Sequence, residues 1–420
     1  MLGKFFPVLQ VLKKAADLLV RSGEFGAAQR MYRWVIRTRP NDLEVWSSLS
    51  ALAYKLGAPE TARRYLTDGI KNQPFEIYPA SDEQSASILR VRGVQNSVYM
   101  LGKSRNGEYK VKLRGGNFSD RYLTDRKQYS VTSYYILDGN ILSSGQIPEF
   151  DIILNLISDP DLEAQSLKTL SEFLVARPDV PIINPPDKVL ETTRDNNYRR
   201  LNGVPGLRFP QTNRFTVTDA EPEDGQRFLE MHQYSFPLLV RQTGTQNGRS
   251  FHKVDNFEAF MDYVAECETA EIYVIQYEDH MYSDEVFRKM RVFVVDGVIY
   301  PAVCHFDTIW NVHGNNRKEI MLNHPWMMEA EQAFMEDCET YVGAGAYARL
   351  KHLHGIIGLD IFGVDFTVLE DGTVLIYEVN SAMRHSYDHA EDFPYLLSYL
   401  QQVTDAFNTM IAQKLGARKN

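Results

Sequence analysis

FGVDFTVLEDGTVLIYEVN, residues 362–380, decides how the rest of the sequence is interpreted. Two runs of apolar and β-branched residues meet at an Asp-Gly dipeptide (371–372), which is typical of a two-residue hairpin loop. Counting outward from that loop places Asp365 directly opposite Glu378. Because side chains alternate between the two faces of a strand, Asn380 lies on the same face as these two acids.

This arrangement predicts a metal site. Two carboxylates opposed across a β-ladder repel each other unless something compensates for their charge. Gly363, opposite Asn380, leaves room beside the two acids. Carboxylate and amide oxygens are the ligands that Mg²⁺ prefers, so we predict that Asp365, Glu378 and Asn380 bind Mg²⁺. The alternative, a solvated acid at a sheet edge, suits one acid better than a pair.

Composition limits the class of protein. The 420 residues suffice for about two to four domains. Hydrophobic residues make up 44% and aromatic residues 12%, which is ample material for folded cores. The formal charge of −10 argues against nucleic-acid binding, and no apolar run is long enough to cross a membrane. The three cysteines are far apart in sequence, which fits a reducing compartment, so we expect a cytoplasmic protein.

The first 75 residues contain a repeat. Gly, Ala, Arg and Pro at positions 23, 28, 30 and 40 recur 34 residues later, a period that resembles the tetratricopeptide repeat. We predict helices at 7–21, 25–38, 42–55 and 59–71. Such repeats bind peptides or mediate self-association, and the alternative is a helical cap on the following domain.

Residues 76–190 are predicted to form an α/β domain. A buried strand in DIILNLIS (151–158) is followed by a helix over 162–177 and a strand in PIINPP (181–186), which predicts a small parallel, Rossmann-like sheet. No GxGxxG follows a strand, so a dinucleotide site is not proposed. A charge-dense helix is expected over 189–201, where guanidinium groups could contact phosphate or form a solvated face.

PLLVRQTGTQNGRSFHKV, residues 237–254, is a candidate anion site. A strand delivers Arg241 to a polar loop containing Gly244 and Gly248, whose backbone N–H groups could close over an anion. An ordinary exposed hairpin would have the same composition.

Two further segments suggest ligand contacts. The strand that ends at Gln276, Tyr277 and Glu278 offers backbone groups and an aromatic ring to a purine. A hairpin then turns at an Asp-Gly dipeptide (296–297), and its Arg291 faces apolar neighbours. Such a buried cation needs a partner, which could be Glu278, Glu378, a phosphate or a substrate carboxylate.

The remaining polar candidates flank the predicted metal site. Arg384 and His385 follow Asn380 closely, and His305 and His313 bound a polar, aromatic loop. We treat the three histidines as candidates for substrate binding, although a single histidine is more often structural. Helices are expected over 325–341 and 345–354.

In this order, the motifs resemble those of the ATP-grasp ligases, especially the branch of ribosomal-protein glutamate ligases and glutathione synthetases. The resemblance covers residues 151–412. It implies a multidomain α/β and α+β protein with helical repeats (1–75), a Rossmann-like pre-domain (76–190) and an ATP-grasp fold of two α+β subdomains (191–420).

The resemblance also implies roles for the candidate residues. Arg291 and Arg384 would be catalytic, with two Mg²⁺ ions on the acid hairpin, residues 362–380. ATP would be bound by residues from three segments: Arg194, Arg241, Gly244, Gly248, Gln276, Tyr277 and Glu278. Asn196 departs from the family, which commonly has lysine there, so Arg194, Arg199 or Arg200 would have to compensate. Lys289 stands where an acid often precedes the arginine corresponding to Arg291.

The implied reaction joins a small-molecule or peptide carboxylate to an amine. The carboxylate attacks the γ-phosphate of ATP, which forms an acyl phosphate and releases ADP. An amine then displaces phosphate to form the amide. Two alternatives remain: a kinase with the same fold, and a repeat-based interaction protein whose ATP site does not turn over.

Overall fold

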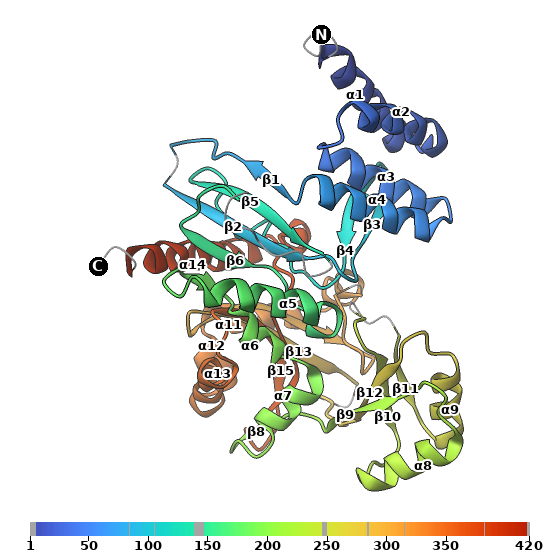
Figure 1. Ribbon diagram of the computed structural model, residues 1–420. Helices are drawn as coiled ribbons and strands as arrows, with labels where there is room; N and C mark the ends of the chain where they lie inside the picture. Colours follow the sequence, from blue (N-terminus) through green and yellow to red (C-terminus); the bar gives the residue numbers. More distant parts are fainter. Residues whose placement is uncertain are drawn as a thin grey trace. The chain divides into compact units, whose positions relative to one another are not determined.

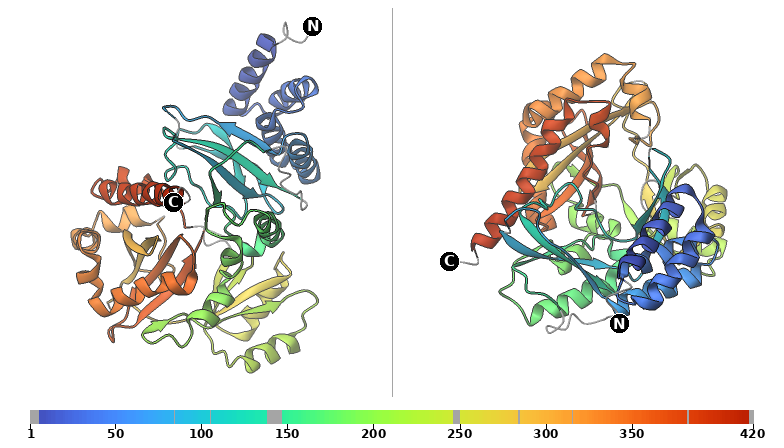
Figure 2. Two further views of the ribbon diagram at one scale, coloured as in Figure 1. Left: turned by 60° about the vertical axis from the view of Figure 1, so that its left-hand side comes forward. Right: turned by 90° about the horizontal axis from the view of Figure 1, so that it is seen from above.

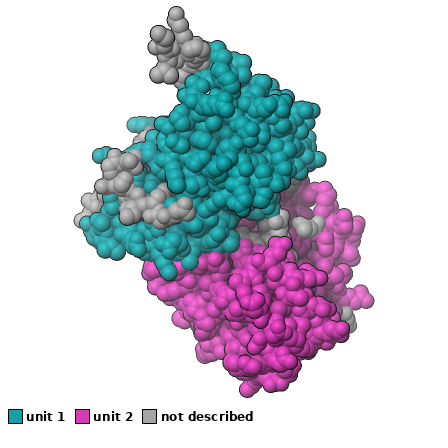
Figure 3. Space-filling view, turned by 45° about the vertical axis from the view of Figure 1, so that its right-hand side comes forward, with its two compact units in different colours: residues 1–117, 126–157, 162–182 teal, residues 118–125, 158–161, 183–420 magenta. Residues whose placement is uncertain are grey.

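The computed structural model describes residues 6–83, 85–104, 106–137, 147–245, 250–283, 285–314, 316–381 and 383–417. The described chain is mixed α/β, with several sheets and helices (Figure 1). None of the helices in these ranges is long and apolar enough to cross a membrane. The chain divides into two compact units, coloured separately in Figure 3. Unit 1 comprises residues 1–117, 126–157 and 162–182, and unit 2 comprises residues 118–125, 158–161 and 183–420. The division into three domains stays a prediction.

Unit 1 begins with four helices that pack one after another along the chain. Their bounds are α1 (Phe6–Ser22), α2 (Phe25–Thr38), α3 (Leu43–Lys55) and α4 (Pro59–Asn72). The side chain of Asp42 accepts from Val45 N at the start of α3, and Pro59 opens α4. The helices lie where the sequence predicts them, within one residue at each end. Their assignment to the tetratricopeptide class stays a prediction.

The main sheet of unit 1 has the strand order β1-β5-β2-β6-β7, and β2 runs parallel to both β5 and β6. A separate hairpin, β3-β4, packs against α3. The elements are β1 (Phe75–Tyr78), β2 (Ala86–Gly93), β3 (Val98–Lys103), β4 (Tyr109–Arg114), β5 (Tyr129–Ile136), β6 (Ile152–Asn155), α5 (Pro160–Val175) and β7 (Ile182–Ile183). The Rossmann-like classification of this sheet is not established.

The described residues of unit 2 form two sheets, which appear as separate yellow-green and orange sheets on the left of Figure 2. The first sheet has the strand order β11-β10-β12-β9, and one of its faces packs against two helices, α8 and α9. The bounds of these elements are β9 (Thr212–Thr216), α8 (Pro222–Met231), β10 (Leu238–Gln242), β11 (Phe251–Val254), α9 (Phe257–Ala265) and β12 (Glu271–Gln276). Leu238 and Val240 point into this core with Ile272 and Val274. By alternation, Arg241 and Tyr273 therefore lie on the opposite face.

The second sheet of unit 2 has the order β14-β13-β15-β16-β8 and carries the acid hairpin. Its strands are β8 (Leu207–Arg208), β13 (Phe287–Val295), β14 (Val298–Asp307), β15 (Ile361–Val368) and β16 (Val374–Asn380). The helices of this unit outside the first sheet's core are α6 (Pro186–Leu190), α7 (Arg194–Leu201), α10 (Arg317–Met321), α11 (Pro325–Glu336), α12 (Cys338–Val342), α13 (Ala344–Ile357) and α14 (Leu396–Ala417), with a 3₁₀ turn, η2 (Asp388–Glu391).

The acid hairpin has the predicted pairing but not the predicted loop. Asp365 is opposite Glu378, as expected. The loop, however, has three residues, because Leu369 N donates to Thr373 O and Gly372 adopts φ +79°. A bulge in β16 opposite the Asp365/Phe366 step restores the register.

The surroundings of Gly363 differ from the expectation. Gly363 does pair with Asn380, but the space beside it is filled, because a Cβ there would lie 2.4 Å from Met383 Cβ. Glycine is therefore required for close packing and does not provide an open ligand space.

The second Asp-Gly hairpin, between β13 and β14, is confirmed as a two-residue loop. Val295 pairs with Val298, and Asp296 and Gly297 both have positive φ, 49° and 78°. These are the signs of a type I′ turn, whose twist matches the flanking strands.

A buried ion pair joins α10 to α11. Arg317 donates to Glu331 through two nitrogens, and their side chains are 1% and 0% exposed. Glu331 also accepts from Cys304 N at 2.7 Å and from the Tyr395 hydroxyl at 2.6 Å. His305 Nδ1 accepts from Arg317 at 3.2 Å. The carboxylate is thus fully satisfied in a site without solvent.

We predict that Arg317→Met destabilises the chain by about 3–5 kcal/mol, because Glu331 would be left buried without a counter-charge. Lys318→Met is the matched control: Lys318 pairs with Asp392 but is 62% exposed, so its loss should cost less than about 1 kcal/mol. Urea-unfolding midpoints measure both. Equal, small shifts in the two variants would contradict the account of the buried pair.

Candidate active site

One pocket in unit 2 brings together several of the predicted site residues. Its walls come from five parts of the chain that are far apart in sequence. They are Ser158, Asp159, Pro160 and Asp161; Thr192, Thr193 and Arg194; Arg241, Gln242, Gly244 and Thr245; Tyr273; and Glu378, Val379, Asn380 and Ser381. A hydrogen bond links the segment 378–381 to the segment 158–161, because the Ser381 hydroxyl donates to Ser158 O at 2.7 Å.

Arg194 reaches the pocket because the predicted helix over 189–201 is broken. α6 ends at Leu190, and α7 starts at Arg194 after Thr193, which has extended backbone angles (φ −60°, ψ 153°). The prediction of one continuous helix is therefore wrong. The break places Thr193 and Arg194, at the N-terminal end of α7, in the lining of the pocket, where the helix dipole favours negative charge.

The structure also separates the three arginines that could compensate for Asn196. Only Arg194 lines the pocket. Arg199 donates to Asp195, and Arg200 donates to the carbonyl of Ile356. The Asn196 side-chain amide donates a hydrogen bond to Glu191 O at 2.8 Å.

Arg241 is the second cation of the pocket. It is 9% exposed, and its guanidinium donates to the hydroxyl and the carbonyl oxygen of Thr245. Burial, together with the nearby Arg194 guanidinium, lowers the pKa of Arg241 to about 10. Arg241 is still a cation at neutral pH. A cation whose pKa is depressed by burial and by another cation gains from the approach of an anion.

A row of charges crosses the acid hairpin. Arg291 is paired across the ladder with Asp365, which is opposite Glu378, and Glu378 is bonded to Arg194. Arg291 Nε and Nη2 donate to the two oxygens of Asp365 at 2.7 and 2.9 Å. Lys289 Nζ lies 3.8 Å from Asp365. The partner of Arg291 is therefore Asp365, and neither Glu278 nor Glu378.

These contacts set the charge state of Asp365. Burial by itself would raise its pKa, but the charge and hydrogen bonds of Arg291 hold the pKa below the usual range. Burial lowers the pKa of Lys289, while Asp365 opposes this shift. The acid is ionised and compensated, which resolves the repulsion expected between opposed carboxylates.

The residues present fit a Mg²⁺ ion only in part. Glu378 and Asn380 line the pocket with oxygen ligands, whereas both oxygens of Asp365 accept from Arg291. Among the described residues, no three His, Cys, Asp or Glu side chains form a metal cluster. Mg²⁺ commonly binds one or two carboxylates and completes its shell with phosphate oxygens and water, and Glu378 with Asn380 suits that mode.

The predicted purine-binding segment does not line the pocket. Gln276 binds backbone instead, accepting from Ser235 N at 3.2 Å and donating to Ser235 O at 2.9 Å. The Tyr277 ring lies 4.0 Å from Lys253 Nζ, and Glu278 forms an ion pair with Arg208 at 3.4 Å.

Four further predicted residues also lie outside the pocket lining. His305 is buried against Arg317, and His385 is buried with its Nε2 3.1 Å from the Thr404 hydroxyl. Arg384 is 71% exposed and pairs with Asp388. His313 is half-buried. Gly248 falls outside the described residues.

No cysteine of the chain is suited to nucleophilic catalysis. All three are free thiols, and burial raises the pKa of Cys267 to about 11 and those of Cys304 and Cys338 to about 12. None is a thiolate at neutral pH.

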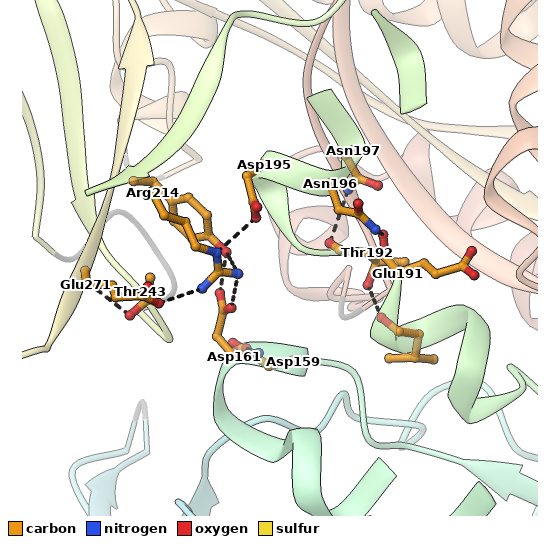
Figure 4. Close-up of polar contacts among 12 residues, drawn as sticks. Asp159, Asp161, Glu191, Thr192, Asp195, Asn196, Asn197, Arg214, Thr243 and Glu271 are labelled. Atoms are coloured by element: carbon orange, nitrogen blue, oxygen red, sulfur yellow. Dashed lines mark hydrogen bonds and ion pairs between the residues drawn. The ribbon is translucent and has the colours of Figure 1, made fainter. Parts of the chain in front are cut away.

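Sequence reasoning missed one wall of the pocket, residues 158–161. This segment directly follows β6, a strand that is buried throughout. Polar residues directly after a buried strand are a signal from which this wall could have been predicted. Figure 4 shows Asp161 pointing at Arg214, a residue that no motif had singled out.

Comparisons with known proteins give only distant similarity. No protein-family model and no curated protein matches the chain. Among solved structures, it is similar to D-alanine–D-alanine ligase from Bacillus anthracis complexed with ATP (13% identity, 80% of this chain and 99% of that chain, TM-score 0.46). It is also similar to the VanG D-Ala:D-Ser ligase from Enterococcus faecalis (12% identity, 78% of this chain and 99% of that chain, TM-score 0.44). A third similar structure is a RimK domain ATP-grasp protein from Sphaerobacter thermophilus (13% identity, 66% of this chain and 90% of that chain, TM-score 0.38). At these low identities and TM-scores, the similarity by itself establishes neither the fold nor the activity.

We predict that Arg194→Met weakens binding of ATP with Mg²⁺ by about tenfold or more, because it removes a charge-assisted contact from the pocket. Arg199→Met removes the same charge from the same helix outside the pocket and should leave binding within about twofold of the unchanged protein. Isothermal titration calorimetry measures both. Equal losses would show that the net charge of α7, rather than the position of Arg194, matters.

The burial of His385 predicts a pH dependence of stability. Burial lowers its pKa to about 4, whereas an unfolded histidine has a pKa of about 6.5. The unfolded chain therefore binds the extra proton first, so this stabilising contribution is complete above about pH 6.5 and is lost as the pH falls toward 4. His385→Asn should flatten the dependence of the urea midpoint over that interval. His352→Asn, at an exposed position of α13, should leave the slope unchanged; a similar change in both would contradict the assignment.

Proposed function

We propose that this chain is an ATP- and Mg²⁺-dependent ligase of the ATP-grasp type that joins a carboxylate to an amine. The observation that carries the proposal is the convergence of Arg194, Arg241, Glu378 and Asn380 on one pocket. Two guanidinium groups suit the phosphates of a nucleotide, and the two oxygen ligands suit the cation that accompanies them. The motif order of the sequence favours ligation over phosphate transfer to a hydroxyl.

Four residues of the pocket, together with Arg291, then have defined tasks. Arg194 and Arg241 neutralise the charge that develops as the γ-phosphate moves to the substrate carboxylate. Glu378 and Asn380 hold Mg²⁺, which supplies further charge neutralisation on the phosphate oxygens when bound. Arg291 keeps Asp365 ionised at the far side of Glu378. The amine then displaces phosphate from the acyl phosphate, so no side-chain nucleophile is needed.

The ion pair between Arg194 and Glu378 has a consequence for binding. In the protein without ligands, each group neutralises the other. When nucleotide and metal arrive together, Arg194 can turn to phosphate while Glu378 turns to the metal, so neither charge is left buried and unpaired. Metal and nucleotide should therefore strengthen each other's binding.

We predict that the protein, given ATP, Mg²⁺, hydroxylamine and a panel of amino acids and other carboxylates, forms ADP and a hydroxamate of one carboxylate. Hydroxylamine traps an acyl phosphate, so this product identifies the activated substrate. Glu378→Gln should lower turnover by about 100-fold or more while the protein stays folded, because it removes a charged metal ligand.

Glu370→Gln, in the loop of the same hairpin, is the matched control and should retain full turnover. AMP as the nucleotide product would contradict acyl-phosphate chemistry. ADP with a phosphorylated hydroxyl product would replace the ligase by a kinase. Full turnover in Glu378→Gln would rule out the proposed metal ligand.

A further inference from the structure

Arg214 is the centre of a polar cluster that includes Asp161, a residue of the pocket lining (Figure 4). It lies on β9, and its guanidinium donates to three carboxylates: Asp161 at 2.5 Å, Asp195 at 3.1 Å and Glu271 at 3.1 Å. It also donates to the Tyr273 hydroxyl at 2.8 Å. That hydroxyl in turn donates to the second oxygen of Asp161 at 2.6 Å.

Cross-strand register connects Arg214 to the proposed phosphate site. Arg241 pairs with Tyr273, and Tyr273 pairs with Arg214, so the three side chains form a row across β10, β12 and β9. Neighbouring strands are about 4.8 Å apart. Arg214 therefore lies two strands from Arg241, beside Tyr273 and Asp161, which line the pocket.

The charge balance of the pocket lining poses a problem for a nucleotide. The lining carries two cations, Arg194 and Arg241, and three carboxylates, Asp159, Asp161 and Glu378. Like charges a few ångströms apart in a partly buried site repel by several times the thermal energy. A polyphosphate therefore needs a counter-charge for this lining beyond the two arginines that it contacts.

Arg214 supplies that counter-charge to Asp161 in particular. Of its three carboxylates, Asp195 is 9% exposed but also accepts from Arg199 at 3.1 Å, and the Glu271 side chain is 42% exposed to solvent. Asp161 has the shortest contact with Arg214, and its side chain is only 13% exposed. Loss of Arg214 would therefore leave its largest uncompensated charge on Asp161, at the pocket.

We propose that Arg214 is a positioning residue that neutralises and fixes Asp161, and so allows the pocket to accept the phosphates of a nucleotide. This inference rests on the proposed function, since it concerns the same pocket. Arg214 does not line the pocket itself and acts through Asp161 and Tyr273.

The test measures binding of ATP with Mg²⁺ to the full chain by isothermal titration calorimetry. Arg214→Gln should raise the Kd about tenfold. Arg214→Lys, which keeps the charge, should stay within about threefold of the unchanged protein. The double variant Arg214→Gln with Asp161→Asn should return to within about threefold, because both charges are removed together. A residue that only supports the fold would not be rescued by the loss of a second polar partner.

Two further variants complete the design. Arg227→Gln removes an exposed arginine of α8 and should leave the Kd unchanged. Asp161→Asn alone keeps Arg214 and should bind ATP at least as tightly as the unchanged protein, which provides a test even if Arg214→Gln does not fold. Binding weakened in Asp161→Asn, or a double variant as weak as Arg214→Gln, would overturn the inference. If the unchanged protein does not bind ATP with Mg²⁺, the proposed function fails, and this inference fails with it.

Discussion

The opposition of Asp365 and Glu378 across two adjacent strands is the constraint on which the rest of the site depends. Two carboxylates in such a pair are ionised only where cations compensate them. The chain provides one arginine for each acid, Arg291 from β13 and Arg194 from α7. Both arginines come from elements distant in sequence, so the acid hairpin fixes how these elements meet.

The same principle extends outward from the hairpin. Arg194 forms an ion pair with Glu378 and also lines the pocket. Its charge contributes to the lowered pKa of the neighbouring Arg241. Arg214, two strands from Arg241, donates hydrogen bonds to three more carboxylates. The pocket is thus a set of nearly balanced charges in partly buried positions. In such a set, a ligand binds by exchanging partners with the protein, and its affinity depends on what the displaced groups contact next.

The sequence predicts the acid hairpin well and its loop poorly, for a physical reason. Both Asp-Gly dipeptides favour tight turns, but only the pair 296–297 forms a two-residue loop. At 371–372 the loop takes in a third residue, and a bulge further along β16 offsets the change. The longer loop shifts the register by one residue and the bulge shifts it back, so Asp365 and Glu378 are opposite each other as predicted. Dipeptide preference describes the turn alone, whereas register depends on the whole ladder.

Tertiary contacts set the remaining differences between prediction and structure. Local charge density could not distinguish Arg194 from Arg199, because a helix break at Thr193 selects which of them reaches the pocket. Arg214 stands in an unremarkable strand and matters only through partners up to 59 residues away, such as Tyr273. Conversely, the aromatic segment ending at Glu278 looked like a ligand contact but binds its own chain.

A crystal structure of the protein with ADP and Mg²⁺ would test the central claim most directly, because it locates the partners of Glu378 and Arg194. The account predicts Mg²⁺ about 2.1 Å from a Glu378 oxygen, with the Arg194 guanidinium moved from that carboxylate to a phosphate oxygen. Nucleotide bound elsewhere, with the ion pair between Arg194 and Glu378 intact, would contradict it.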